Sequence, residues 1–309
     1  MLRENMIWVA LFVVVLLIAA ASPVFLSSQN IVNILRQISI LGVVAIGMTF
    51  PLIAGAFDLS VGATMGFATV VAIQFQPKDL PSAMGSLVAA LALGIIVGIV
   101  NGWLIGIFKT NSVVTTIGTM YIVWGATLIY TQSKHVWVFD MFPSMEALGT
   151  GYVGPFPVPV LILAATAVLG HAVLNYTRFG RYVHATGGNS EAARLSGVNT
   201  ARTRLIAFII SGAAASIAGI IIAARVKNVD PSFGIGYEFE GLTAVVLGGT
   251  SLLGGRGSVS GTVAGVLLLG VLANAMTLLN ISFNYQLMIK GIILILAVAG
   301  DVIARTRRG

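Results

Sequence analysis

The sequence predicts an all-α integral membrane protein of about ten transmembrane helices, some of them short or broken, with both termini in the cytoplasm. Three observations predict this fold: the scarcity of charge, the frequency of glycine and the uneven placement of the basic residues. Of the 309 residues, 57% are hydrophobic and only 9% are charged, whereas roughly a quarter are charged in a soluble domain. The chain therefore has too little charge to cover a surface that faces water.

Glycine accounts for 36 residues, and membrane helices use small residues to bring their backbones close together. Cysteine is absent, which excludes disulfides, thiol catalysis and thiolate metal sites. The net charge of +7 does not indicate nucleic-acid binding, because the basic residues fall in short gaps between apolar runs. We expect the lipid bilayer to surround the chain, and we expect no nucleic-acid partner and no metal site.

Ten apolar segments are candidates for spanning helices, each of which needs about 20 mainly apolar residues. Two of them are weak, since 59–75 follows an aspartate and 241–255 is short and rich in glycine. If one or both re-enter the bilayer from one side, eight or nine spans remain. The ten candidates are 6–22, 37–56, 59–75, 84–108, 113–130, 158–176, 205–224, 241–255, 258–279 and 287–304.

The first segment also has features of a cleavable signal peptide. Its apolar run, 7–21, has the length of a signal-peptide core, Arg3 precedes it and three alanines end it. Glu4 offsets Arg3, however, and another apolar segment follows without a soluble domain to export. We therefore interpret the first segment as an uncleaved span.

The basic residues give the orientation. With ten spans and both termini inside, 11 of the 17 basic residues face the cytoplasm, five face outwards and Lys290 lies within the last span. Cytoplasmic loops of membrane proteins carry an excess of Lys and Arg. The densest cluster lies in the loop 177–204, which we therefore expect to be cytoplasmic: Arg178, Arg181, Arg194, Arg202 and Arg204.

We treat residues 1–309 as one transmembrane domain, within which two segments have similar sequences. Gly47-Met48-Thr49, followed by Gly55, has the same spacing as Gly241-Leu242-Thr243, followed by Gly249. The spacing between the copies is about 194 residues, and both copies run inwards in the ten-span arrangement. This pattern predicts a parallel repeat around 42–72 and 236–267, and the alternative is a chance coincidence of glycines.

Several motifs indicate structure and exclude catalysis. Glycines at every fourth residue, from Gly94 to Gly106 and from Gly257 to Gly265, predict close helix packing, within the subunit or across a dimer. The run 248–257 resembles a phosphate loop, but Gly255 stands where the lysine is required. The three histidines lack ligand spacing. We therefore expect a chain that is not an enzyme and does not hydrolyse ATP.

Asp58 lies between two apolar runs, and Ser60 and Gly62 follow it. A carboxylate at membrane depth is costly and by default marks a pathway, a cavity or a structural cap. The structural interpretation is that Asp58 caps the helix that begins near Leu59. The two roles can coexist.

The loop 177–204 contains Glu191-Ala192-Ala193, followed after three residues by Gly197. The stretch 190–196 is typical of a short amphipathic helix, which Ser190 can cap and Gly197 can end. A short charged helix in the cytoplasm suits the docking of a soluble partner. The alternative is a solvated loop that anchors the topology through its arginines.

These residues resemble a known family. Glu191-Ala192-Ala193 with Gly197 is similar to the EAA-x-x-x-G loop of bacterial ABC importer permeases, although the later Leu-Pro of many such loops is missing. Together with three further motifs, the chain resembles the ribose-type monosaccharide permeases over about 30–301. The Ala56-Phe57 pair departs from the family's usual Gly-Ile, a difference that we expect to bear on substrate preference. The further motifs are Phe57 to Gly62, Thr186 to Asn189, and Ala244 to Ser258.

The resemblance implies a permease subunit in the bacterial inner membrane that carries a monosaccharide by alternating access. It implies three partners: a second permease subunit in a homo- or heterodimer, a cytoplasmic ATPase that binds ATP and Mg, and an extracytoplasmic sugar-binding protein. The chain itself would hold no cofactor. The alternatives are a related ABC permease for branched-chain amino acids or nucleosides, and a secondary transporter.

The resemblance also implies two sets of site residues. We expect coupling to the ATPase at Gly187, Gly188, Asn189, Glu191, Ala192, Ala193, Arg194 and Gly197. We expect a translocation pathway or a structural motif at Asp58, Ser60, Gly62, Gly248, Gly249, Thr250 and Ser251.

Overall fold

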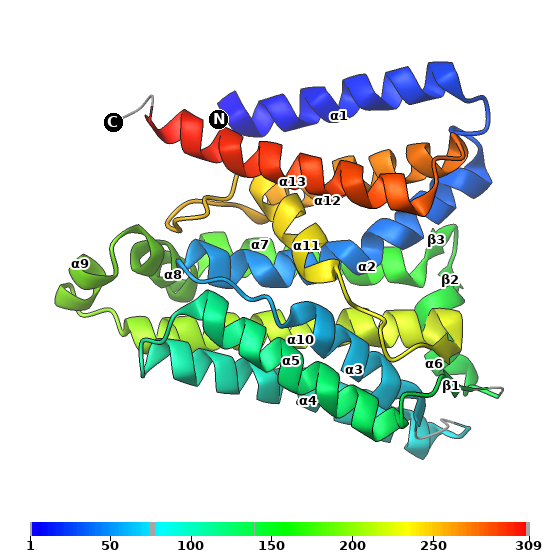
Figure 1. The fold of residues 1–309 in the computed structure, drawn as a ribbon, viewed down its shortest axis with the longest axis horizontal. Helices are drawn as coiled ribbons and strands as arrows, with labels where there is room; N and C mark the ends of the chain where they lie inside the picture. The colour runs from blue at the N-terminus through cyan, green and yellow to red at the C-terminus, as the bar shows by residue number, and fades with distance from the viewer. Residues whose placement is uncertain (1, 75–77, 139, 307–309) are drawn as a thin grey trace.

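The computed structural model describes residues 2–74, 78–138 and 140–306, which form a bundle of helices lying side by side (Figure 1). Two pairs of two-residue strands are the described extended elements. The helices are α1 (Leu2–Ala21), α2 (Ser28–Ile53), α3 (Val61–Gln74), α4 (Leu80–Gly106), α5 (Ser112–Thr131), α6 (Pro143–Thr150), α7 (Val158–Tyr176), α8 (Arg178–Gly188), α9 (Ser190–Leu195), α10 (Thr200–Val226), α11 (Tyr237–Leu247), α12 (Val259–Leu278) and α13 (Phe283–Thr306).

Seven helices within the described residues are long and apolar enough to cross a membrane: α2, α4, α5, α7, α10, α12 and α13. Shorter apolar stretches lie at Ile7–Ala20 in α1 and Val61–Ile73 in α3. The α11 helix has 11 residues, or about 16 Å at 1.5 Å per residue, and this length is about half of the hydrocarbon core. The chain is thus an all-α membrane protein, and some of its helices are short, as predicted.

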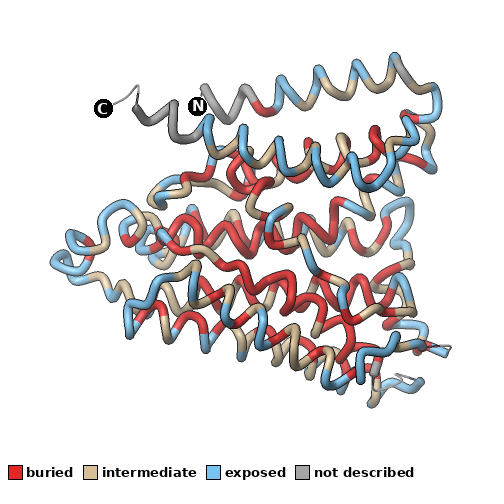
Figure 2. Tube along the Cα trace, in the orientation of Figure 1, coloured by how far each residue is buried: buried red, intermediate tan, exposed pale blue. Residues whose placement is uncertain are grey.

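The core of the bundle is formed by α2 and α10, and 67% of the apolar window of each is buried (Figure 2). By contrast, only 28% and 22% of the windows of α4 and α5 are buried, and that of α13 has no buried residue. Helices with this many apolar residues outside the core fit a lipid environment, because apolar side chains that face lipid are not in contact with water.

The predicted glycine ridge on α4 packs within the subunit. A Cβ at Gly94 would overlap the carbonyl oxygen of Gly212 on α10, and Gly98 meets Phe208 in the same way. Farther along, Gly102 meets Leu205. Side chains at these glycines would push the two backbones apart, so the ridge determines how closely α4 and α10 approach.

The two ends of the bundle differ. The start of α1 and the end of α13 lie at the same end as α8 and α9, while α6 and the strands lie at the other end (Figure 1). There β1 (Val136–Trp137) pairs with β4 (Asn228–Val229), and β2 (Tyr152–Val153) pairs with β3 (Phe156–Pro157), both antiparallel. The first pair joins the chain after α5 to the chain after α10.

Most segment boundaries agree with the prediction, and 158–176 matches α7 residue for residue. Two differ clearly. The α2 helix begins at Ser28 rather than at 37, because Ser27 caps it by accepting a hydrogen bond from the N–H of Asn30. The prediction of 241–255 as one helical segment is wrong, because α11 ends at Leu247, before glycines with positive φ. Arg307 and Arg308, which contributed to the charge asymmetry, lie outside the described residues.

Candidate coupling and translocation site

Residues 177–204, predicted to form a cytoplasmic loop, contain two successive helices, α8 and α9. The hydroxyl of Thr177 caps α8 by accepting from the N–H of Gly180 at 3.2 Å. The side chain of Asn189 caps α9, because its Oδ1 accepts from the N–H groups of Glu191 and Ala192 at 3.1 and 2.9 Å. The prediction of Ser190 as the cap is therefore wrong by one residue, and α9 itself lies where the sequence placed it.

Gly197 ends α9 as predicted, with a φ of +85°. Its N–H donates to the carbonyl oxygen of Arg194, and the next N–H, of Val198, donates to that of Ala193, both at 3.0 Å. These two bonds satisfy carbonyls that the helix end leaves free. An added Cβ at Gly197 would meet no atom within 4 Å, so the requirement for glycine is conformational rather than steric.

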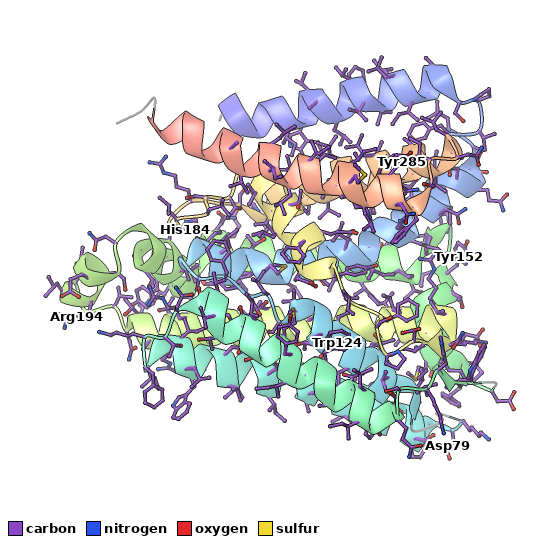
Figure 3. The ribbon with its side chains drawn as sticks, viewed as in Figure 1. Asp79, Trp124, Tyr152, His184, Arg194 and Tyr285 are labelled. Atoms are coloured by element: carbon purple, nitrogen blue, oxygen red, sulfur yellow. The ribbon has the colours of Figure 1, made fainter. Side chains whose placement is uncertain are left out.

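The exposed residues of α9 are Glu191, Ala192, Arg194 and Leu195, whereas Ala193 is buried. Arg194 lies at the tip of the molecule, at the same end as His184 and opposite Asp79 and Tyr152 (Figure 3). Its Nε donates to Oε2 of Glu191 at 3.1 Å, and this hydrogen bond lowers the pKa of the Glu191 carboxyl. Both side chains are exposed, so their pairing contributes little to stability and they remain accessible to a partner.

Behind α9, four glycines from three distant segments meet in what we call the glycine junction: Gly55, Gly187, Gly254 and Gly255. A Cβ on Gly187 would overlap the carbonyl oxygen of Ile53, and a Cβ on Gly254 would lie 2.7 Å from the Cα of Gly55. The N–H of Gly255 donates to the carbonyl oxygen of Ile53 at 2.8 Å. Backbone therefore packs directly on backbone where the end of α8 meets the end of α2 and the non-helical segment after α11.

Side chains complete the junction. Nδ1 of His184, on α8, lies 3.2 Å from the carbonyl oxygen of Gly255. Gly188 supplies backbone only, as its Cα lies 2.7 Å from the position of a Cβ on Gly255, while a Cβ on Gly188 itself would meet nothing within 4 Å. The structure thus brings Gly187 and Gly188 to the loop after Gly248–Ser251, and it leaves Glu191, Ala192 and Arg194 outside the junction.

The α2 and α11 helices end in the same way, 194 residues apart. Gly55 and Gly249 have φ values of +77° and +87°. The N–H of Ala56 donates to Pro51 at 2.9 Å, and the N–H of Thr250 donates to Val245 at 3.2 Å. After each end the chain runs without helix, over 54–60 and 248–258, before α3 and α12 begin.

Asp58 lies in the first of these two helix breaks and is buried. Its Oδ1 accepts from the N–H of Ser60 at 3.1 Å and from the hydroxyl of Ser60 at 2.6 Å. Asn101 on α4 donates to the same hydroxyl oxygen at 2.9 Å, and its own Oδ1 accepts from Thr119 on α5 at 2.6 Å. Asp58 therefore holds the turn before α3, not the first-turn amides that a helix cap would bind, and a chain of polar groups fixes α3 to α4 and α5.

Gly62 lies on the first turn of α3, away from the glycine junction. A Cβ there would overlap a carboxylate oxygen of Glu238, a buried residue of α11. In the second break, Gly248 packs on Gly261, and the buried hydroxyl of Thr250 has no hydrogen-bond partner among the described residues. These motif residues therefore determine how α3, α11 and α12 approach one another.

Two acidic residues of α11 were not singled out by any sequence pattern. Glu238 is buried and accepts from the N–H of Gly236 at 3.1 Å. Glu240 pairs with Lys290 of α13. Asp58 is thus not the only carboxylate within the bundle, and the signal for the pair was present in Lys290, a charge inside an apolar span.

No group of three or more metal-ligating side chains occurs among the residues that the structure describes. The geometry instead defines a membrane bundle with two broken helices, whose breaks meet beneath a short, charged, exposed helix.

The sequence belongs to the family described as the branched-chain amino acid transport system / permease component, which matches residues 30–298. The chain is a multi-pass membrane permease. It is 35% identical to the ribose import permease protein RbsC of Haemophilus influenzae, over 99% of this chain and 95% of that protein. It is 36% identical to RbsC of Escherichia coli, over 97% and 94%, and 42% identical to the L-arabinose transport system permease protein AraH of Escherichia coli, over 93% and 87%. No solved structure matches the chain.

Proposed function

We propose that this chain is the membrane subunit of an ATP-driven importer that carries a monosaccharide across the bacterial inner membrane. The observation that carries the proposal is the glycine junction, which joins α8, the helix directly before the exposed α9, to the breaks after α2 and α11. The names of the similar permeases, for ribose, L-arabinose and xylose, favour a pentose over a branched-chain amino acid as the substrate.

In this proposal ten segments enter the membrane: the seven long helices, α1, and the shorter α3 and α11. Both termini and the α8–α9 pair face the cytoplasm. The 11-to-5 asymmetry of the basic residues supports this orientation. The start of α1 and the end of α13 lie at the same end as α9, which supports an even number of crossings (Figure 1).

The proposed repeat consists of α2 with α3 and of α11 with α12. Its support is the identical pattern of hydrogen bonds at Ala56 and Thr250, together with the positive φ at Gly55 and Gly249. Non-helical backbone at membrane depth persists only where protein covers it or where it lines a cavity. The two breaks are therefore the segments that we assign to the translocation pathway.

The partners follow from the two ends of the bundle. A cytoplasmic ATPase, which binds ATP and Mg, docks on the exposed residues of α9, and a sugar-binding protein docks at the end formed by α6 and the strands. A second permease subunit completes the pathway. When the ATPase subunits close, α9 moves with them, and because α8 touches both breaks through Gly187, the movement reaches the pathway. Alternating access follows from opening the pathway to one side at a time.

The orientation is tested with single cysteines, since the chain has none of its own. Leu195 in α9 and Val153 at the other end are 75% and 62% exposed, so neither substitution disturbs packing. A membrane-impermeant thiol reagent added to intact cells should label Val153→Cys, and Leu195→Cys should be labelled only after the cells are broken. Labelling of both variants in intact cells would contradict the topology and the site of ATPase docking.

A further inference from the structure

A cavity of about 410 Å³ lies between α9 and the membrane-embedded bundle, next to the glycine junction. It is lined by Gly55 and Ala56 of the first break, by the connection from α4 to α5, and by the first turns of α9 and α10. The charged side chains of its wall are three cations, Lys109, Arg194 and Arg204, and one carboxylate, Glu191.

The charge of this cavity is only partly balanced. Glu191 is committed to Arg194, while no ion pair involves Lys109 or Arg204 within the part of the chain that the structure describes. The Nε of Arg204 is buried and has no hydrogen-bond partner there. A buried guanidinium N–H without an acceptor is costly, so Arg204 lacks an anionic partner in this wall. Serine and threonine hydroxyls in the wall, from Ser112 and Thr200, are further donors for oxygen atoms.

The cavity adjoins the side of the bundle that faces lipid. Two exposed aromatic residues lie beside Lys109: Trp103 near the end of α4 and Phe108 in the connection itself, and their rings pack edge to face at 4.8 Å. Aromatic side chains gather at the membrane–water interface, and most of the apolar windows of α4 and α5 is not buried within the bundle. An occupant can therefore reach the cavity sideways from the bilayer.

We infer that this cavity binds the phosphate of an anionic phospholipid headgroup, held by Lys109 and Arg204. Basic pockets between membrane helices near the cytoplasmic surface are suited to such headgroups. The acyl chains would lie along the exposed face of α4, and the headgroup would contact α9 and the first break at once. Anionic lipid would thus stabilise the arrangement that couples α9 to the first break. The inference rests on the membrane placement of the proposed function, but the lipid assay needs neither sugar nor ATP, so the two can fail separately.

The test uses the purified full-length chain in neutral detergent. Short-chain phosphatidylglycerol, phosphatidylcholine and inorganic phosphate are titrated separately, and the midpoint of thermal unfolding is recorded. We expect phosphatidylglycerol to raise the midpoint, and the two other compounds to leave it unchanged at the same concentrations. Lys109→Gln, an exposed position that does not affect packing, should weaken the apparent affinity about fivefold, which corresponds to one charge near a membrane surface. Arg204→Gln combined with Lys109→Gln should abolish the shift.

Arg202→Gln is the matched control. Arg202 lies on α10, as Arg204 does, but it is exposed and does not line the cavity. It should behave as the unchanged protein does. If Lys109→Gln binds phosphatidylglycerol as tightly as Arg202→Gln, the assignment of the site is wrong. An equal shift from inorganic phosphate would show a site for soluble anions and overturn the lipid headgroup. The absence of any shift in the unchanged chain would overturn the inference as well.

Discussion

The backbone N–H of Gly255 donates a hydrogen bond of 2.8 Å to the carbonyl oxygen of Ile53. Ile53 is the last residue of α2, and Gly255 lies in the break that follows α11, so this bond links two segments about 200 residues apart. The carbonyl oxygen of Ile53 also faces Gly187 of α8. One backbone group therefore connects both breaks to the helix pair that we assign to ATPase coupling.

Substitution of Gly187 tests this connection. Gly187→Ala places a methyl group against the carbonyl oxygen of Ile53, and overpacking of this kind costs about 1–3 kcal/mol. We expect a lower midpoint of thermal unfolding and a loss of ATP-driven uptake. Gly188→Ala is the control, since its added methyl group has open space, and it should keep both properties. Equal uptake by the two variants would show that the glycine junction does not transmit movement.

Substitution of Gly197 tests α9 itself. Valine at this residue must adopt a φ of +85°, which costs about 1–2 kcal/mol for a residue with a Cβ, and it should fray the end of α9. Expression and membrane insertion should remain normal, because the residue is exposed and far from the core. Sugar uptake and co-purification of the ATPase should fall together, and more so when Glu191→Lys is added.

Gly197→Asn is the matched control for that experiment, because asparagine tolerates positive φ better than other residues with a Cβ. It should retain most of the uptake. Full uptake by the Gly197→Val, Glu191→Lys double variant would show instead that the loop is only a topological anchor.

Substitution of Asp58 distinguishes a structural role from proton coupling. Asn keeps an oxygen that can accept from the N–H and hydroxyl of Ser60, so Asp58→Asn should transport within a few-fold of the unchanged protein. Leu leaves the N–H and the hydroxyl of Ser60 without their acceptor, at a cost of about 1–3 kcal/mol. Asp58→Leu should therefore lose stable expression or uptake. A complete loss of uptake in Asp58→Asn, with normal folding, would indicate that the charge itself is required.

The long helices could be predicted from the sequence because their boundaries have local causes. Prolines at 157 and 159 and the capping Thr177 define α7 and the start of α8. The end of α11 was missed because apolar residues continue past Gly249, and only the backbone geometry shows that the helix has ended. Local composition determines where a helix can form, whereas a break inside an apolar run depends on what packs against it.

The candidate site was predictable in its members and not in its arrangement. The motifs that contain Gly55, Gly187 and Gly255 were each visible in the sequence, but their meeting depends on packing between segments far apart in the chain. The sequence did not single out Glu240, because α11 is short and its first residues include polar ones. Its partner Lys290 shows that the residue belongs within the bundle. The sequence marks Lys290 as a charge inside an apolar span, but it does not show which residue pairs with it.

The central claim, that the chain carries a monosaccharide under the control of an ATPase docked at α9, is tested most directly by uptake into proteoliposomes. The permease would be reconstituted with its ATPase and its binding protein, and the entry of labelled ribose, L-arabinose, xylose and leucine would be measured with and without ATP. We predict entry of at least one of the sugars, dependent on ATP and on the binding protein, and no entry of leucine. Sugar uptake driven by a proton gradient without ATP, or ATP-driven uptake of leucine alone, would contradict the claim.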